Sequence, residues 1–191
     1  MKRKILCLLI ACSLALTISA GAFTDTLNTK YEEAANRLSA LGIMRGYEDG
    51  SFKPERNVSR AEFSALITRA LGYEDAAGMK APFTDVPENH WAAEEIAIAE
   101  VLGIVNGVGN GLFSPDNEVT YEQAIKMIVT ALGYNELAIT KGGYPNGYIT
   151  VASSKGILKK VGRADNTPAT RGDIVLLLNE AIDIDIADSE D

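Results

Sequence analysis

Three short motifs carry the residues best placed for chemistry: Ser59-Arg60-Ala61-Glu62, Thr120-Tyr121-Glu122-Gln123 and Thr170-Arg171-Gly172-Asp173. A Ser or Thr followed three residues later by Glu, Gln or Asp is typical of a capping box, in which two side chains satisfy free amides at a helix start. The helix-capping residues predicted on this basis are Ser59, Glu62, Thr120, Gln123, Thr170 and Asp173.

Two of the motifs place an arginine, Arg60 or Arg171, at the first helical position. A cation there faces the positive end of the helix dipole, which costs about 0.3–1 kcal/mol when it is exposed. A helix N-terminus that carries an arginine is also an anion site, and the guanidinium can grip a carboxylate with two parallel hydrogen bonds. Spacing alone leaves both a carboxylate-binding arginine and a plain solvated arginine open.

The helices that follow these motifs each carry one apolar stripe with the 3.6-residue period. Three copies of the stripe need a common place of burial, so we predict a mainly helical, all-α fold with three such helices packed around a pseudo-threefold axis. The stripe residues are Phe63, Leu66, Ile67, Ala70 and Leu71, then Ala124, Met127, Ile128, Ala131 and Leu132, then Ile174, Leu177, Leu178, Ala181 and Ile182.

The stripes belong to a longer internal repeat. Phe23-Thr24-Asp25 recurs as Phe83-Thr84-Asp85, and Ala70-Leu71-Gly72-Tyr73 recurs as Ala131-Leu132-Gly133-Tyr134. A more degenerate third copy includes Lys155-Gly156-Ile157. Each copy is predicted to be helix, loop, helix, with repeats at 23–73, 83–134 and 143–183 and an acidic tail at 184–191 that we expect to be solvated and frayed.

The first helix of the first repeat is expected to bury Tyr31, Ala34, Ala35, Leu38 and Leu41 on one face. Gly42 then provides the left-handed stop. The segment from Gly46 to Pro54 combines a turn signal with a very short extended piece.

The N-terminus has the pattern of a signal peptide over residues 1–22: a basic start, an apolar run from Ile5 to Ile18, and a small-residue site before Phe23. Two alternatives stay open, a retained membrane anchor and lipidation at Cys12. Export with cleavage would remove both cysteines, Cys7 and Cys12, so the exported chain would have no disulfide.

The chain is acidic, with 18 Lys and Arg against 26 Asp and Glu and a net charge of −8. Without residues 1–22 it has 15 basic and 26 acidic residues, a net charge of −11. An acidic surface repels nucleic acid and anionic lipid at long range, so neither is expected as a partner.

A Leu-Gly-Ile step, Leu41-Gly42-Ile43, recurs as Leu102-Gly103-Ile104, and a Gly-rich loop ends in Phe52-Lys53-Pro54 and again in Phe113-Ser114-Pro115. Together with the helix-start motif and the Phe-Thr-Asp opening with Trp91, these features resemble the S-layer homology (SLH) family over residues 23 to about 183. The resemblance implies a three-repeat helical spindle around a central three-helix bundle. It also implies a non-enzymatic, cofactor-free role at the extracellular cell wall or surface layer. Members tether exported proteins to pyruvylated secondary wall polysaccharide linked to peptidoglycan, and other surface-layer proteins are a further class of partner.

Position by position, the resemblance implies that Arg60 and Arg171 bind the ketal carboxylate of the polysaccharide. Trp91 would stack on a sugar, Asp25 and Asp85 would accept sugar hydroxyls, and Gly46 would allow close backbone approach; these six form the implied ligand-binding set. The family pattern is broken by Tyr121 at an arginine position, by Tyr31 at the Trp position, and by Tyr144-Pro145-Asn146-Gly147-Tyr148 in place of the third opening. The resemblance places the ligand in grooves between the repeats, and because of these departures we expect one or two working grooves, not three.

Three other functions are compatible with parts of the sequence. An enzyme would have to work with one histidine, His90, and little chain outside the repeats, although carboxylates are plentiful. A calcium module has oxygen-rich candidates in Glu48-Asp49-Gly50 and the acidic tail, but neither has the calcium-loop spacing. The third rival keeps the fold and makes it a protein-docking or self-associating scaffold with inactive sugar grooves, which Tyr121 favours.

Overall fold

The computed structural model describes residues 23–73 and 78–187. The predicted signal peptide, its alternatives at Cys12 and the last four residues of the acidic tail lie outside these residues. The described part contains seven α-helices and no strand, so the all-α prediction is confirmed. None of its helices has the length and apolar character that a membrane span requires.

The seven helices fall into a central set and an outer set. The central helices, each of eleven residues, are α2 (Arg60–Ala70), α4 (Tyr121–Ala131) and α7 (Arg171–Ala181). The outer helices are α1 (Glu32–Ala40), α3 (Ala93–Val101), α5 (Asn135–Thr140) and α6 (Asn146–Ser154).

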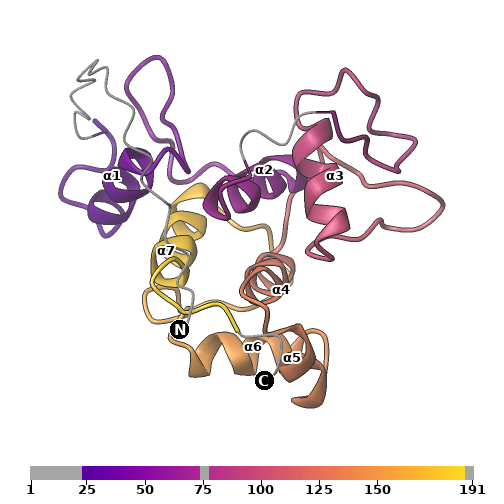
Figure 1. The fold of residues 1–191 in the computed structure, drawn as a ribbon. Coiled ribbons are helices and arrows are strands. Elements are labelled where there is room, and N and C mark those ends of the chain that lie inside the picture. Colours follow the sequence, from indigo (N-terminus) through magenta and orange to yellow (C-terminus); the bar gives the residue numbers. More distant parts are fainter. Residues whose placement is uncertain (1–22, 74–77, 188–191) are drawn as a thin grey trace.

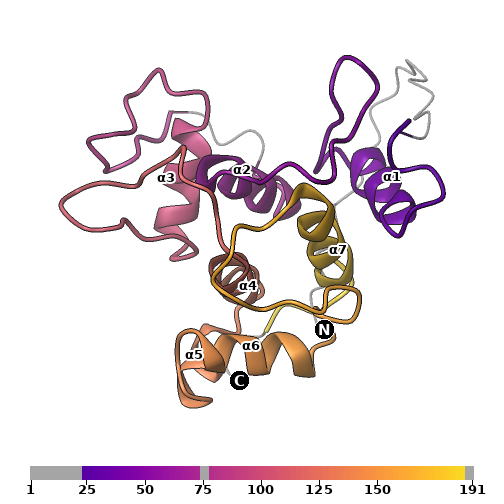
Figure 2. The ribbon, with the colours of Figure 1, turned by 180° about the vertical axis from the view of Figure 1, so that it is seen from behind.

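The central helices surround one axis, as Figure 1 and the opposite view in Figure 2 show. Helix α4 packs on both α2 and α7. Their apolar stripes are buried as predicted, apart from Leu71 and Ala131, which are only partly buried. Because the three helices have one length and register, equivalent positions can be compared directly.

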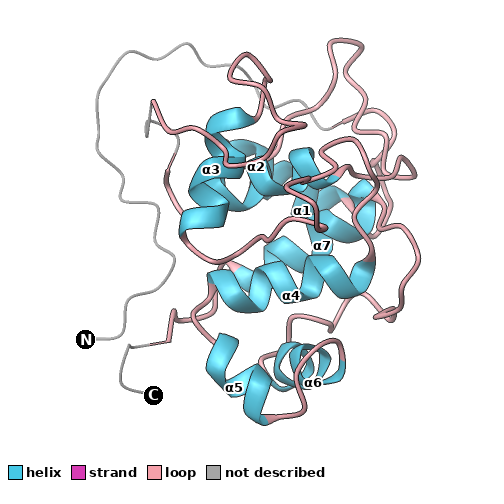
Figure 3. Cartoon of the chain, turned by 90° about the vertical axis from the view of Figure 1, so that its right-hand side faces the viewer, coloured by secondary structure: helices cyan, strands magenta, loops and turns pink. Residues whose placement is uncertain are grey.

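Three of the outer helices each pack on the central helix of another repeat, and α5 packs mainly on α6. Helix α3 lies on α2, α6 lies on α4, and α1 lies on α7, near the other end of the chain. The outer helices therefore form three projections around the centre, with α5 and α6 below α4 in Figure 3. The α1–α7 contact closes the three repeats into a ring.

Backbone hydrogen bonds also close this ring on its axis. Val58 N donates to Ala169 O at 3.0 Å, Ala169 N donates to Val119 O at 2.9 Å, and Val119 N donates to Val58 O at 2.9 Å. All three residues are buried, so each amide needs an internal partner. These contacts join the short extended pieces that precede the central helices, one from each repeat.

Three local expectations need correction. Leu41 is 40% exposed, because α1 ends at Ala40 and Leu41 is its C-cap; Gly42 follows with a φ of 74°, as predicted. Helix α5 was not predicted, since its six residues are too few to show a period. The tail was expected to be solvated, but Ala187 N donates to Leu132 O at 2.9 Å, so the described tail residues dock on the end of α4.

Candidate functional site

The predicted capping boxes are present at two of the three central helices. Ser59 with Glu62, and Thr120 with Gln123, each make both reciprocal bonds. Thr170 accepts from the Asp173 amide, but the predicted reach-back of the Asp173 carboxylate is wrong. That carboxylate accepts from Tyr121 Oη and Lys30 Nζ instead, because its side chain is shorter than that of Glu and two donors from other repeats lie closer.

The first amides of the central helices already have backbone partners. Arg60 N donates to Asn117 O at 2.8 Å and Ala61 N donates to Pro115 O at 3.0 Å. Equivalent bonds start the other two helices, from Tyr121, Glu122, Arg171 and Gly172 to carbonyls of Thr167, Asp165, Arg56 and Pro54. The first amides of these helices are therefore occupied, and the arginine side chains are the groups at the helix starts that could meet an anion.

The Arg60 guanidinium is held against the loop of the second repeat. Its Nε donates to Phe113 O and its Nη2 to Asn106 O, both at 3.0 Å. The guanidinium also lies 4.5 Å from the centroid of the Phe113 ring. These contacts leave the residue 8% exposed and fix the orientation of its charge.

Arg171 repeats this arrangement against the loop of the first repeat. Its Nε donates to Phe52 O and its Nη2 to Arg45 O, both at 2.9 Å. Its guanidinium carbon lies 4.8 Å from the Phe52 ring centroid and 5.1 Å from that of Tyr47. The two arginines, 111 positions apart in the sequence, therefore occupy equivalent junctions between repeats.

Neither arginine forms an ion pair within the described residues. Burial lowers the pKa of both guanidinium groups, and the charge of Asp85 offsets this only in part at Arg60. A buried cation without a carboxylate partner is costly. Both junctions are thus suited to receive an anion.

Asp25 and Asp85 hold the loops that carry these arginine contacts. Each carboxylate accepts two backbone amides, at 2.7 Å from Phe52 and Lys53 to Asp25. Asp85 accepts from the next loop in the same way, at 2.8 and 2.7 Å. Because Phe52 also accepts from Arg171, one residue links Asp25 to that arginine; Phe113 links Asp85 to Arg60.

Gly46 lies beside the carbonyl that binds Arg171, and its backbone approaches a ring. A Cβ at Gly46 would overlap the ring of Phe23, and a Cβ at Gly107 would lie 2.9 Å from the ring of Phe83. At both glycines the backbone closely approaches the aromatic residue that opens the repeat, and at Gly107 it also approaches the Leu112 carbonyl oxygen.

Trp91 is 58% exposed and stacks on His90, with ring centroids 5.8 Å apart. It lines a polar hollow of about 550 Å³ together with Arg56 and the capping residues Ser59 and Glu62. Arg171 is not among the lining residues of this hollow. The structure therefore presents a free indole face without placing it directly against either predicted arginine.

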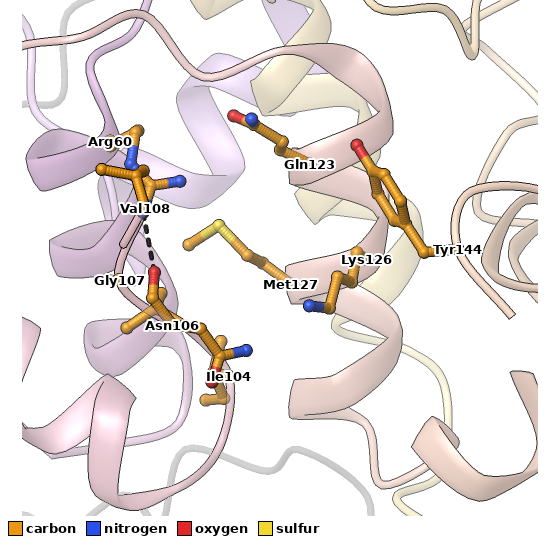
Figure 4. A pocket seen from close by; sticks show the side chains of 10 residues that line it. Arg60, Ile104, Asn106, Gly107, Val108, Gln123, Lys126, Met127 and Tyr144 are labelled. Carbon is orange, nitrogen blue, oxygen red and sulfur yellow. Dashed lines mark hydrogen bonds between the residues drawn. The ribbon is translucent and has the colours of Figure 1, made fainter. Parts of the chain in front are cut away.

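A second cavity, of about 220 Å³, contains Arg60 and is called the Arg60 groove below. Figure 4 shows that Gln123 and Lys126 reach into it from α4, opposite the loop with Asn106 and Gly107, and that Tyr144 borders it. Lys126 and Tyr144 are not among the site residues predicted from the sequence. The available signal was a lysine at an α4 position where the aligned helices have Ala65 and Leu176.

The third junction differs from the two arginine junctions. Tyr121 is fully buried, and its hydroxyl donates to Asp173 Oδ2 at 2.5 Å. Lys30 Nζ lies 3.2 Å from the other oxygen of the same carboxylate. Arg163, from the loop of the third repeat, lies 5.0 Å from the Tyr121 ring centroid. An internal carboxylate thus occupies this junction.

Comparison with known proteins places these features in a family. The S-layer homology domain model matches residues 22–64 and 82–125, the first two repeats. A "Cell surface protein" of Thermoanaerobacter kivui is 39% identical over 85% of this chain, and a "Middle cell wall protein" of Brevibacillus brevis is 36% identical over 96%. A "Surface layer protein" of Brevibacillus choshinensis is 36% identical over 83% of this chain.

This chain spans only 21%, 18% and 15% of those three relatives, respectively. The similarity therefore concerns one module of longer proteins. The matched repeats contain Arg60, Asp25, Asp85, Trp91 and Gly46, and the third repeat completes the same ring in the structure. The chain belongs to the S-layer homology domain family.

Proposed function

We propose that this chain is a non-enzymatic module that anchors an exported protein to the bacterial cell envelope. It associates with the cell wall or surface layer, as the names of its relatives suggest. Its ligand is an acidic, pyruvylated secondary wall polysaccharide that binds in the junctions between repeats, without covalent chemistry.

One observation carries the proposal: two buried guanidinium groups are held by carbonyl oxygens and, among the described residues, by no carboxylate. A ketal carboxylate would supply the missing counter-charge and can accept from a planar guanidinium fork. In an acidic chain this attraction is local, because the net charge of −8 repels an anionic polymer at long range.

The other implied site residues support the arginines in this proposal. Trp91 offers an exposed aromatic face of the kind on which a sugar ring packs. Asp25 and Asp85 position the loops, and the lone pairs left on their carboxylates accept sugar hydroxyls. Gly46 lets the Phe23 ring pack beneath the carbonyl that binds Arg171.

Co-sedimentation with peptidoglycan sacculi tests the proposal, before and after acid removal of the secondary polymer. We expect the protein to pellet with intact sacculi and to stay in solution with stripped ones. The double variant Arg60→Gln/Arg171→Gln should lose most of the binding. Lys80→Gln is the matched control, since it removes one positive charge from an exposed ion pair with Glu88.

The opposite results have distinct meanings. Equal binding to intact and stripped sacculi would assign the ligand to peptidoglycan itself. No binding to either preparation would overturn anchoring and favour the protein-docking or self-associating scaffold. Circular dichroism and thermal unfolding of the double variant separate lost binding from lost folding.

A further inference from the structure

The sixth residue of the central helices differs between repeats. It is Ala65 in α2, Lys126 in α4 and Leu176 in α7. Ala65 and Leu176 are buried, whereas Lys126 is partly exposed and lines the Arg60 groove. Only in α4 does this position put a cation beside a helix-start arginine.

The third residue of these helices also differs in charge. It is Glu62 in α2 and Asp173 in α7, but the neutral Gln123 in α4. None of the ten residues that line the Arg60 groove is acidic, and two of them, Arg60 and Lys126, are cations. The groove is thus locally positive in a chain whose net charge is −8.

The Lys126 ammonium is not committed to a carboxylate within the described part of the chain. It lies 5.9 Å from the centroid of the Tyr144 ring, which is 48% exposed. Glu122 is the carboxylate on this side, and it accepts from Tyr144 Oη at 3.4 Å. The Lys126 charge therefore faces the groove, together with an open aromatic ring.

We propose that Lys126 is a specificity-determining residue that makes the Arg60 groove select an acidic glycan segment with two negative groups. This rests on the proposed function. Arg60 takes the first carboxylate, Lys126 takes a second anionic group on the adjoining sugar, and the Tyr144 ring borders the sugar that bears it. The second group is a carboxylate or a phosphate, since an ammonium binds either as a point charge.

Titration calorimetry of the purified protein with three soluble sugars tests this inference. The first sugar is a pyruvylated monosaccharide with one carboxylate. The other two are pyruvylated disaccharides whose second unit carries either a carboxylate or a phosphate. We expect the disaccharide with the correct second group to bind about fivefold tighter than the monosaccharide, which is the size of a partly exposed ion pair.

Lys126→Gln should remove this preference, lowering affinity for the doubly charged sugar about fivefold and leaving the monosaccharide unchanged within twofold. Lys80→Gln, outside the groove lining, should leave all three affinities unchanged. The tighter binder of the two disaccharides identifies the second group as carboxylate or phosphate.

Other results overturn the inference. If Lys126→Gln lowers the affinity for all three sugars equally, Lys126 contacts the first carboxylate and does not distinguish the sugars. If wild type binds all three sugars equally and Lys126→Gln changes nothing, the selectivity is absent while the proposed function stands. If no sugar binds while sacculi binding persists, the pyruvylated ligand itself is wrong, which separates that failure from failure of Lys126 alone.

Discussion

The third junction allows a sharp stability test, because Tyr121→Phe deletes one hydroxyl and little else. The hydroxyl is fully buried and donates to Asp173 Oδ2 at 2.5 Å. A hydrogen bond to a charged group contributes about 1.5–3 kcal/mol. The remaining partner, Lys30, has a side chain that is 58% exposed, so its ion pair contributes less than about 1 kcal/mol and cannot compensate.

We therefore expect Tyr121→Phe to lower the free energy of unfolding by about 2 kcal/mol and Tm by about 4–8 °C. Urea unfolding followed by circular dichroism measures this directly. A double-mutant cycle with Asp173→Asn should give a coupling energy of about 1–2 kcal/mol. Tyr73→Phe is the control, since Tyr73 is 42% exposed and should change stability by less than about 0.5 kcal/mol.

The same bond sets a signature at alkaline pH. Burial, followed by the hydrogen bond to Asp173 and its charge, raises the pKa of Tyr121. A group whose pKa is higher in the folded than in the unfolded state contributes its full stabilisation at pH values below its unfolded pKa, which is about 10 for tyrosine. This contribution is lost as pH rises through the pKa of the folded state. Wild type should lose stability above pH ~10 more steeply than Tyr121→Phe. A Tyr121→Phe variant as stable as wild type at pH 7 would refute the reasoning.

Three further predictions concern the loops and the tail. Gly107→Ala should lower the free energy of unfolding, measured in urea, by about 1–3 kcal/mol, because the new Cβ would lie 2.7 Å from Leu112 O. As a control, Ala substitution at an exposed loop glycine with negative φ should leave the stability unchanged. Burial alone would raise the pKa of Asp85, but hydrogen bonds from backbone amides and the Arg60 charge lower it overall. The folded protein should therefore lose stability as pH falls below about 4, through the lowered pKa. In thermal melts at a series of pH values, Asp85→Asn should reduce this loss of stability at acid pH. Tyr134→Phe should lower the free energy of unfolding by about 1 kcal/mol, because it removes the 2.9 Å hydrogen bond to Asp185 O. The Ala187 amide should then exchange its hydrogen faster, and an unchanged exchange rate would argue against docking of the tail.

Short-range features of the fold followed directly from the sequence. The capping boxes at Ser59 and Thr120, the stop at Gly42 and the apolar stripes depend on residues within a few positions of one another. A helix start needs only its own first turn, and a stripe needs only the helical period. The repeat also indicated that the three stripes share one place of burial.

The residues proposed to meet an anion could be identified only in part from the sequence. Arg60 and Arg171 stood out because a cation at a helix start is locally unfavourable. Lys126 and Tyr144 did not, because no local motif surrounds either residue; Lys126 is unusual only beside its equivalents Ala65 and Leu176 in the other repeats. A helix pattern identifies which residues share a face, but it does not identify which loop will lie opposite.

Tertiary structure alone decided the partners of these elements. Three sets of contacts join residues more than 45 positions apart. They are the packing of α1 on α7, the cyclic backbone hydrogen bonds among Val58, Val119 and Ala169, and the hydrogen bond from Tyr121 to Asp173, whose carboxylate does not cap its own helix. The helix propensity of a segment does not identify such pairs, since any repeat can bury its apolar face against either neighbouring repeat. Closing the ring satisfies the buried amides and apolar faces of all three repeats at once, and that requirement selects the pairing.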